Sequence, residues 1–165
     1  MTKNKPNQGV KKTETLTLRL EPKLKFLIEL ISRMKRQSIT GVVESAVEDL
    51  AFGLDVSFHD NGTTEPLAMV SALANIWSTD ESERFLNFCY HLPHLMTYED
   101  QRVWETIKVS PVFFEAKKSK ASAPQKIERL DQLDRLVVSQ SWQSLLQHVE
   151  MNKDNRVVVP FERRH

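Results

Sequence analysis

The segment Glu14-Thr15-Leu16-Thr17-Leu18-Arg19-Leu20 decides the expected fold of the N-terminal part of this chain. Its leucines alternate strictly with polar residues, and a period of two with β-branched threonine is typical of a strand buried on one face. No turn signal and no second strand follow it closely, so its backbone N–H and C=O groups need partners from elsewhere. The simplest partner is a second copy of the same segment. The sequence therefore predicts a homodimer joined by an antiparallel two-stranded ribbon.

Two amphipathic helices are expected directly after this strand. Pro22 suits the first position of a helix over residues 22–35. Its apolar residues recur at helical spacing, and they are Leu24, Leu27, Ile28, Ile31 and Met34. Ser38 is a good N-cap for a second helix, which Gly53 closes. The apolar stripe of this second helix consists of Ile39, Val42, Val43, Ala46, Val47 and Leu50.

The order of strand, helix, turn and helix resembles the ribbon-helix-helix family of DNA-binding proteins, which includes the Arc, MetJ and CopG-type repressors. The segments Thr15 to Pro22 and Gln37 to Val47 carry the resemblance, which covers residues 14–54. It implies a dimer core made of Leu16, Leu18, Leu20, Leu27, Ile31, Val43 and Val47. Family members usually have glycine in the interhelix turn, where a left-handed backbone is needed. This chain has Lys35-Arg36-Gln37 there, and a non-glycine residue in that conformation costs about 1 kcal/mol.

The outward face of the ribbon is the expected DNA-reading surface. A two-stranded ribbon fits the major groove, where each base pair shows a distinct pattern of donors and acceptors. The resemblance implies that Thr15, Thr17 and Arg19 read bases, each of them twice about the two-fold axis. Arg19 can bind guanine O6 and N7, and the threonines can contact thymine methyl groups. The alternative is an ordinary solvated strand face.

A second set of residues is expected to hold DNA phosphates. The N-terminus of the second helix offers free N–H groups and the positive end of the helix dipole. The predicted phosphate contacts are Ser38, Ile39, Thr40, Lys11, Lys12, Lys23, Lys35 and Arg36. The charge distribution favours this interpretation: residues 1–40 carry ten Lys/Arg and three Asp/Glu, whereas residues 41–165 carry thirteen and nineteen. The chain is therefore basic at one end and acidic elsewhere, although its total charge is +1.

Composition and motifs exclude several other classes of protein. No apolar run approaches the roughly 18 residues that a membrane span requires, and no apolar segment of a secretory signal follows the basic N-terminus. The single Cys89 fits a reducing compartment, and we expect a cytoplasmic, nucleoid-associated protein. The cluster of Cys89, His91 and His94 is expected to be a core thiol with surface histidines, because Pro93 breaks the helical register. We expect no metal site, no cofactor and no catalytic residues.

The expected fold class is mainly α, with four parts along the chain. Residues 1–13 form a basic arm, residues 14–54 the ribbon-helix-helix module, residues 55–64 a linker with a turn at Asn61-Gly62, and residues 65–165 a separate helical domain of no recognised family.

The helical domain has its own boundary signals. We expect helices that open at Pro66, at the capping box of residues 78–81 and at Thr97, and a longer helix over residues 125–151. Pro93 and Pro111 are expected to end helices, and Trp77, Trp104 and Trp142 to lie in the core. Val157-Val158-Val159 could form a short strand.

Two functions remain open at this stage. The first is a prokaryotic or phage protein that binds double-stranded DNA as a homodimer, or as pairs of dimers, and represses transcription, including that of its own operon. The second is an antitoxin or adaptor, in which the ribbon mainly dimerises and residues 65–165 bind a protein partner of a toxin, plasmid-transfer, partition or defence complex. An enzyme is not expected, because no nucleophile, base and orienting group occur together.

Overall fold

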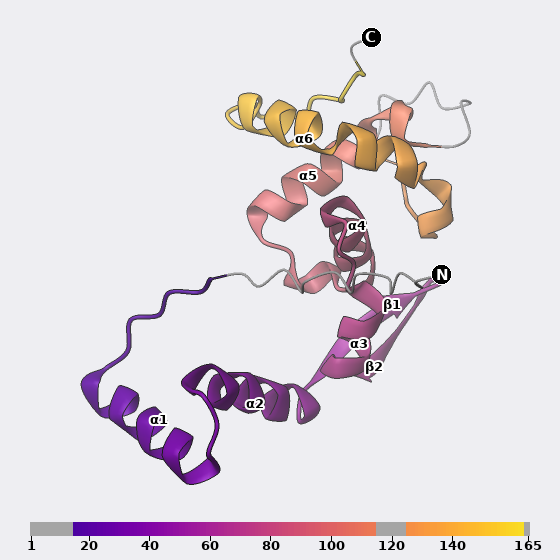
Figure 1. The fold of residues 1–165 in the computed structure, drawn as a ribbon. Helices are drawn as coiled ribbons and strands as arrows, with labels where there is room; N and C mark the ends of the chain where they lie inside the picture. The colour runs from indigo at the N-terminus through magenta and orange to yellow at the C-terminus, as the bar shows by residue number, and fades with distance from the viewer. Residues whose placement is uncertain (1–14, 115–124, 164–165) are drawn as a thin grey trace, which may run out of the picture. The chain divides into compact units, whose positions relative to one another are not determined.

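The computed structural model describes residues 15–114 and 125–163 and is mainly helical, with one small antiparallel sheet (Figure 1). The chain divides into two compact units between Ala46 and Val47, and each is described separately below. The expectation of a mainly α protein is confirmed. The structure does not test the ribbon-helix-helix arrangement itself, because the ribbon needs a second chain.

The first unit contains α1 (Pro22–Lys35) and the start of α2 (Ile39–Phe52), and both helices begin and end where the sequence predicts them. The expected left-handed residue of the interhelix turn is Arg36, with φ 54° and ψ 39°. The N–H groups of Arg36 and Gln37 bond back to the carbonyls of Arg33 and Ser32, which is the hydrogen-bond pattern of a Schellman motif. Ser38 caps α2 as expected, because its Oγ accepts the Gly41 N–H at 3.0 Å.

Residues 15–20 precede α1 and have no assigned secondary structure in the single chain. The predicted strand over residues 14–20 therefore stays a prediction, since the pairing that would form it lies between two copies. Residue 14 and the arm of residues 1–13 lie outside the described residues.

A β-hairpin occupies the segment that the sequence analysis assigned to a linker, so the linker prediction for residues 55–64 is wrong. Strands β1 (Asp55–Asp60) and β2 (Thr63–Ala68) pair antiparallel, and Asp60 faces Thr63 across the predicted turn. Asn61 and Gly62 both have positive φ, 46° and 84°, as a tight two-residue hairpin turn requires. The hairpin folds here because its apolar residues pack on a small cluster with the helices that follow: Val56, Phe58, Leu67, Met69, Ala72, Ile76 and Leu92.

Pro66 does not open a helix, as the sequence analysis expected. It lies in β2 opposite Ser57, in a sheet of two strands where both are edge strands and a missing N–H is tolerated. The next helix, α3 (Met69–Ile76), starts three residues later, and the Met69 N–H bonds to the Leu54 carbonyl at 2.8 Å.

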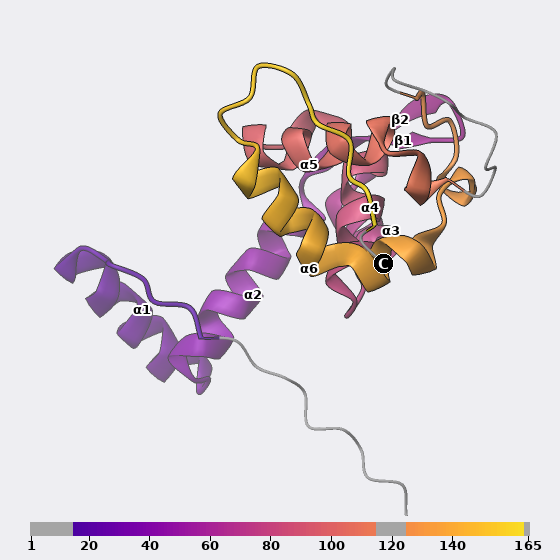
Figure 2. The ribbon, with the colours of Figure 1, turned by 90° about the horizontal axis from the view of Figure 1, so that it is seen from above.

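Three longer helices form the main core of the second unit: α4 (Glu81–His91), α5 (Tyr98–Val109) and α6 (Arg135–Met151). Figures 1 and 2 show α6 running beside α5 and α4, and these helices contact one another. Short 3-10 turns cover Pro93–Leu95, Pro111–Phe113 and Leu130–Gln132. Helix endings at Pro93 and Pro111 and the helix start at Thr97 are confirmed, and Thr97 forms a capping box with Asp100.

Two predicted boundaries in this unit are wrong. The N-cap of α4 is Asp80, whose Oδ1 accepts the Glu83 N–H at 3.1 Å, rather than Ser78. The long helix begins at Arg135 and not at 125, because the Asp134 side chain caps it and the Asp134 N–H bonds to the Phe113 carbonyl. The preceding residue, Leu133, makes an isolated β-bridge with Phe114.

The core prediction for the tryptophans holds for two of the three. Trp104 and Trp142 are buried in the main cluster, but Trp77 is 62% exposed. Trp77 follows the last residue of α3, and the buried residues of that helix are Ala72 and Ile76. The Arg84 guanidinium lies 5.0 Å from the centre of the Trp77 ring and covers part of it.

The C-terminal segment is held against the core without forming the short strand considered at residues 157–159. Phe161 is buried, stacks on Phe113, and donates its N–H to the Oγ of Ser110 at 2.7 Å. His148 of α6 bonds to the Val159 carbonyl at 3.0 Å. These contacts fix the segment along one side of α6 (Figure 2).

Candidate nucleic-acid and dimer interface

The predicted base-reading residues lie in the segment before α1. Thr15, Thr17 and Arg19 are exposed, and so are the leucines that alternate with them, with Leu16 78% exposed. In one chain, therefore, neither face of this segment is covered.

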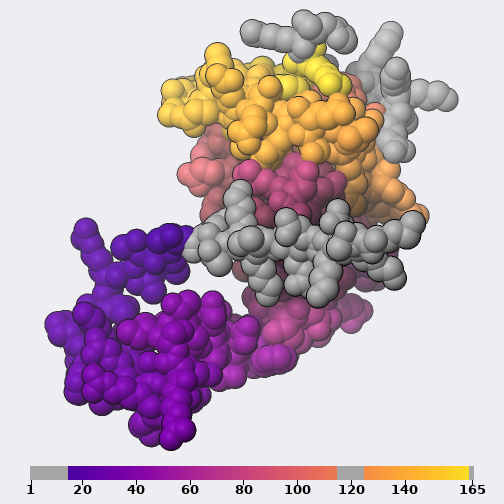
Figure 3. Space-filling model, viewed as in Figure 1, coloured from indigo at the N-terminus to yellow at the C-terminus, as the bar shows by residue number. Residues whose placement is uncertain are grey.

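The residues predicted for the dimer core also lie at the surface of the single chain. No residue of α1 is buried along its whole described length, and Leu27 is 50% exposed. In α2 only Val42 is buried, whereas Val47 is 61% exposed. Leu18 and Leu20 are exposed, and Ile31 and Val43 are partly buried. The surface of these helices is coloured indigo and violet in Figure 3.

A shallow apolar groove runs along α1 next to the predicted ribbon segment. Its volume is about 320 Å³, and it is lined by Glu21, Lys23, Leu24, Phe26, Leu27 and Leu30. Four of these six side chains are large and apolar. An unpartnered helix with such a face gains most of its stability when another element covers it.

Five of the predicted phosphate contacts lie in or next to the turn between α1 and α2. Ser38 precedes α2, and Ile39 and Thr40 are the first two residues of that helix. Their N–H groups have no carbonyl four residues back inside the helix, so they are available to an anion. Lys35 is the last residue of α1 and Arg36 forms the turn, and both are exposed.

The other predicted phosphate contacts lie elsewhere in the first unit. Lys23 is exposed in the first turn of α1. Lys11 and Lys12 lie outside the described residues.

Cys89 and His91 of α4 have structural contacts, and His94, in the following 3-10 turn, is exposed. Cys89 is 1% exposed, and burial raises the pKa of its thiol above the ordinary range, so the group stays protonated. His91 Nδ1 lies 2.7 Å from the His59 carbonyl, and its ring stacks on Phe58. Within residues 15–114 and 125–163, no three His, Cys, Asp or Glu side chains are grouped as a metal site would require.

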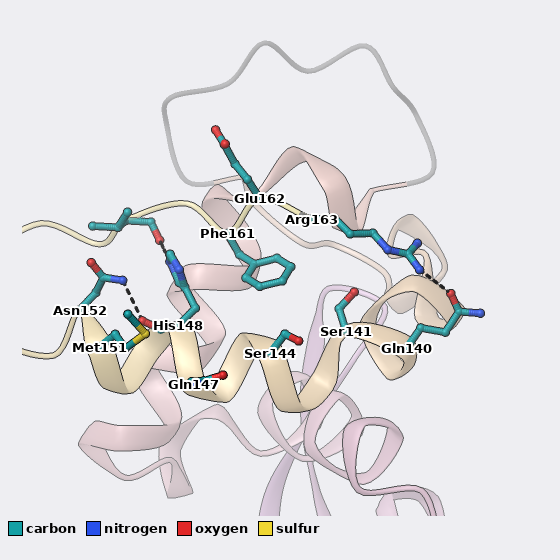
Figure 4. Close-up of a pocket in the computed structure, with 11 residues that line it drawn as sticks. Gln140, Ser141, Ser144, Gln147, His148, Met151, Asn152, Phe161, Glu162 and Arg163 are labelled. Carbon is teal, nitrogen blue, oxygen red and sulfur yellow. Dashed lines mark hydrogen bonds between the residues drawn. The ribbon is translucent and has the colours of Figure 1, made fainter. Parts of the chain in front are cut away.

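A groove of the second unit lies between α6 and the C-terminal segment, and the sequence analysis did not identify it (Figure 4). It has a volume of about 720 Å³, and its α6 wall includes Gln140, Ser141, Ser144 and Gln147. The spacing of these polar residues along one face of a helix was the only sequence pattern that pointed to a polar groove wall. Arg163 on the opposite wall donates to Gln140 Oε1 at 3.1 Å.

We find no family model, curated protein or solved structure that matches this chain.

The described part of the chain contains no helix that combines the length and the apolar character needed to cross a membrane.

Proposed function

We propose that this chain is a homodimeric, sequence-specific double-stranded DNA-binding protein that acts as a transcriptional repressor, including of its own operon. Residues 15–20 of two copies would pair as an antiparallel ribbon, with Thr15, Thr17 and Arg19 in the major groove. The start of α2 and the surrounding Lys and Arg side chains would hold the DNA backbone. The regulated genes lie in a prokaryotic or phage genome, and the protein acts in the cytoplasm.

The observation that carries this proposal is the exposed apolar face of α1, together with the alternating leucines before it. A 14-residue helix in water is marginal unless it buries one face, and α1 buries no residue in the single chain. Burial of a leucine side chain contributes about 1.5–3 kcal/mol, so covering several of them is a large gain. A second copy can cover these residues and also pair the exposed backbone of residues 15–20.

The charge distribution supports DNA as the ligand. The described residues 15–40 include Arg19, Lys23, Lys25, Arg33, Lys35 and Arg36 against Glu21 and Glu29. A dimer would carry twice this excess of positive charge. If it neutralises about 6–10 phosphates, its affinity should fall by about 10³–10⁵ between about 50 and 200 mM salt.

The test is selection of bound sequences from a random duplex library, with mass measurement of the free protein by light scattering. We expect a dimer and a two-fold-related recognition site. Arg19→Ala should weaken binding to that site by about 1–3 kcal/mol and relax its sequence preference at one position per half-site. Lys126→Ala in the second unit is the matched control, because this exposed cation is not a predicted DNA contact. A monomer, or an Arg19→Ala protein with an unchanged site, would refute the proposal.

A second candidate function is that of an antitoxin or adaptor whose second unit binds a protein. The observation in its favour is the exposed apolar pair at the end of α3, where Leu73 lies on the helix and Trp77 directly follows its last residue. Native complexes isolated with the wild-type chain and with Trp77→Ala distinguish the candidates. Loss of a stoichiometric protein partner in the variant supports this function, and identical composition contradicts it.

A further inference from the structure

The groove between α6 and the C-terminal segment contains a buried hydroxyl group that has no partner in the described part of the chain. Ser141 is 5% exposed and lines this groove, and Figure 4 shows its Oγ pointing into it. The other buried serine and threonine side chains within residues 15–114 and 125–163 are Ser82, Thr106 and Ser110. Each of these three donates its hydroxyl to a carboxylate or a carbonyl of the protein, whereas no described residue accepts from Ser141.

A buried hydroxyl without a partner indicates that something else completes the site. Buried polar groups in folded proteins almost always bond to the protein, to water or to a ligand, because an unpaired group loses its hydration without compensation. The groove beside Ser141 has a volume of about 720 Å³, which is in the range of small-molecule sites. The hydroxyl is therefore placed to donate to a molecule bound in the groove.

Arg163 supplies positive charge at the same end of the groove. Its guanidinium donates to Gln140 Oε1 at 3.1 Å, and Gln140 directly precedes Ser141 in α6. Gln140 is uncharged, and none of the ion pairs of the described residues includes Arg163. Figure 4 shows the neighbouring Glu162 directed away from α6. Residues 136–149 of α6 contain no Asp, Glu, Lys or Arg, so the facing wall adds no compensating negative charge.

We propose that this groove binds a small organic oxyanion, a carboxylate or a phosphate ester, with its head group at Ser141 and Arg163. Both side chains donate hydrogen bonds, and the planar guanidinium matches the geometry of a carboxylate or phosphate. The body of the ligand is uncharged, because the groove continues past Ser144 and Gln147 toward the apolar Val159. The site lies in the second unit, and the inference does not depend on the proposed DNA binding.

Titration of the nitrogen-15-labelled full-length chain with three probes, followed by NMR, tests the inference. Hippurate carries a carboxylate on a neutral amide and ring, phenyl phosphate carries a phosphate ester, and hippuramide is the uncharged analogue of hippurate. We expect at least one of the two anions to bind with a dissociation constant of about 1 mM or below and to shift the resonances of the groove residues. Hippuramide should bind at least about tenfold more weakly than the better anion. The anion that binds more tightly identifies the head group.

Two variants test the residues that hold the head group. Ser141→Ala should unfold at the wild-type temperature, because its hydroxyl has no described partner, and should bind the anion about tenfold more weakly. Arg163→Met should weaken binding by roughly ten- to a hundredfold. Arg156→Met is the matched control and should leave affinity unchanged, because Arg156 is exposed and does not line the groove.

Four results would overturn the inference. The first is that neither anion binds, and the second is that hippuramide binds as tightly as hippurate and phenyl phosphate. The third is anion binding that both Ser141→Ala and Arg163→Met leave unchanged, which would place the anion elsewhere on the chain. The fourth is a Ser141→Ala protein that unfolds at a clearly lower temperature, because the hydroxyl would then have its partner within the protein.

Discussion

Removal of the Arg102 guanidinium should destabilise the second unit by releasing the C-terminal end of α6. Arg102 lies on α5, and its guanidinium donates to the Asn152 carbonyl at 2.7 Å and also to the Lys153 carbonyl. Those carbonyls follow the last turn of α6, where a positive charge also favours the negative end of the helix dipole. The guanidinium lies 5.9 Å from the centre of the Tyr98 ring.

The expected magnitude follows from these contacts. A hydrogen bond to a charged group contributes about 1.5–3 kcal/mol, and the dipole adds about 0.3–1 kcal/mol. Water replaces part of these interactions at a half-exposed helix end. Arg102→Met, which keeps the aliphatic stem, should therefore lower the free energy of unfolding by about 2–4 kcal/mol. For a unit of this size the unfolding temperature should fall by roughly 6–14 °C.

Thermal and urea unfolding followed by circular dichroism measure the effect. Arg129→Met is the matched control, because Arg129 pairs at the surface with Asp131 at 2.6 Å and such exposed pairs contribute at most about 1 kcal/mol. An Arg102→Met protein that unfolds within about 0.5 kcal/mol of the wild type would show that these bonds do not hold the helix end.

Three further outcomes are expected. Hydrogen bonds from the Ser82 hydroxyl, the Glu83 N–H and the Ser139 hydroxyl lower the pKa of Asp80 from 3.8 to about 2. The stability they contribute is therefore present above the ordinary pKa and lost as the pH falls toward 2, and urea unfolding of Asp80→Asn should show a flatter acid dependence. Trp142 Nε1 is buried with no described hydrogen-bond partner, so Trp142→Phe should cost less than about 1.5 kcal/mol in thermal unfolding, and Trp142→Ala about 3–5 kcal/mol. Ser38→Ala removes the cap of α2 and should lower helicity and weaken binding to all duplexes alike in gel-shift titrations, by about 1 kcal/mol.

The helices were predictable where local signals agree. Pro22 at the start of α1, Ser38 before α2 and Thr97 before α5 each combine a favourable first-turn residue with an apolar stripe that follows directly. These signals involve residues within one or two helical turns of each other, so they can be read from the sequence without knowledge of tertiary contacts.

The hairpin and the start of α6 were not predictable in the same way. Pro66 suits a helix start as well as an edge strand, and only the pairing with Ser57 decides between them. Ile127, Leu130 and Leu133 have helical spacing, yet they pack against the main cluster from a coil and a 3-10 turn. In both places tertiary contacts outweigh the local pattern.

The candidate interface was likewise predictable only in part, where local spacing decides the structure. The apolar stripes of α1 and α2 follow from spacing alone, and the structure places both helices where that spacing predicts them. What covers a stripe is a different question, because periodicity reports only that a face is apolar. Net charge distinguishes the two helices, because α1 carries four Lys/Arg and one Glu, whereas α2 carries three acidic residues and no Lys or Arg. In the proposed complex α1 therefore has two roles, because its apolar residues would be covered by the second copy and its cations would attract DNA phosphates. Substitutions that remove cations and leave the apolar face intact separate the two roles, because they should weaken DNA binding without dissociating the proposed dimer.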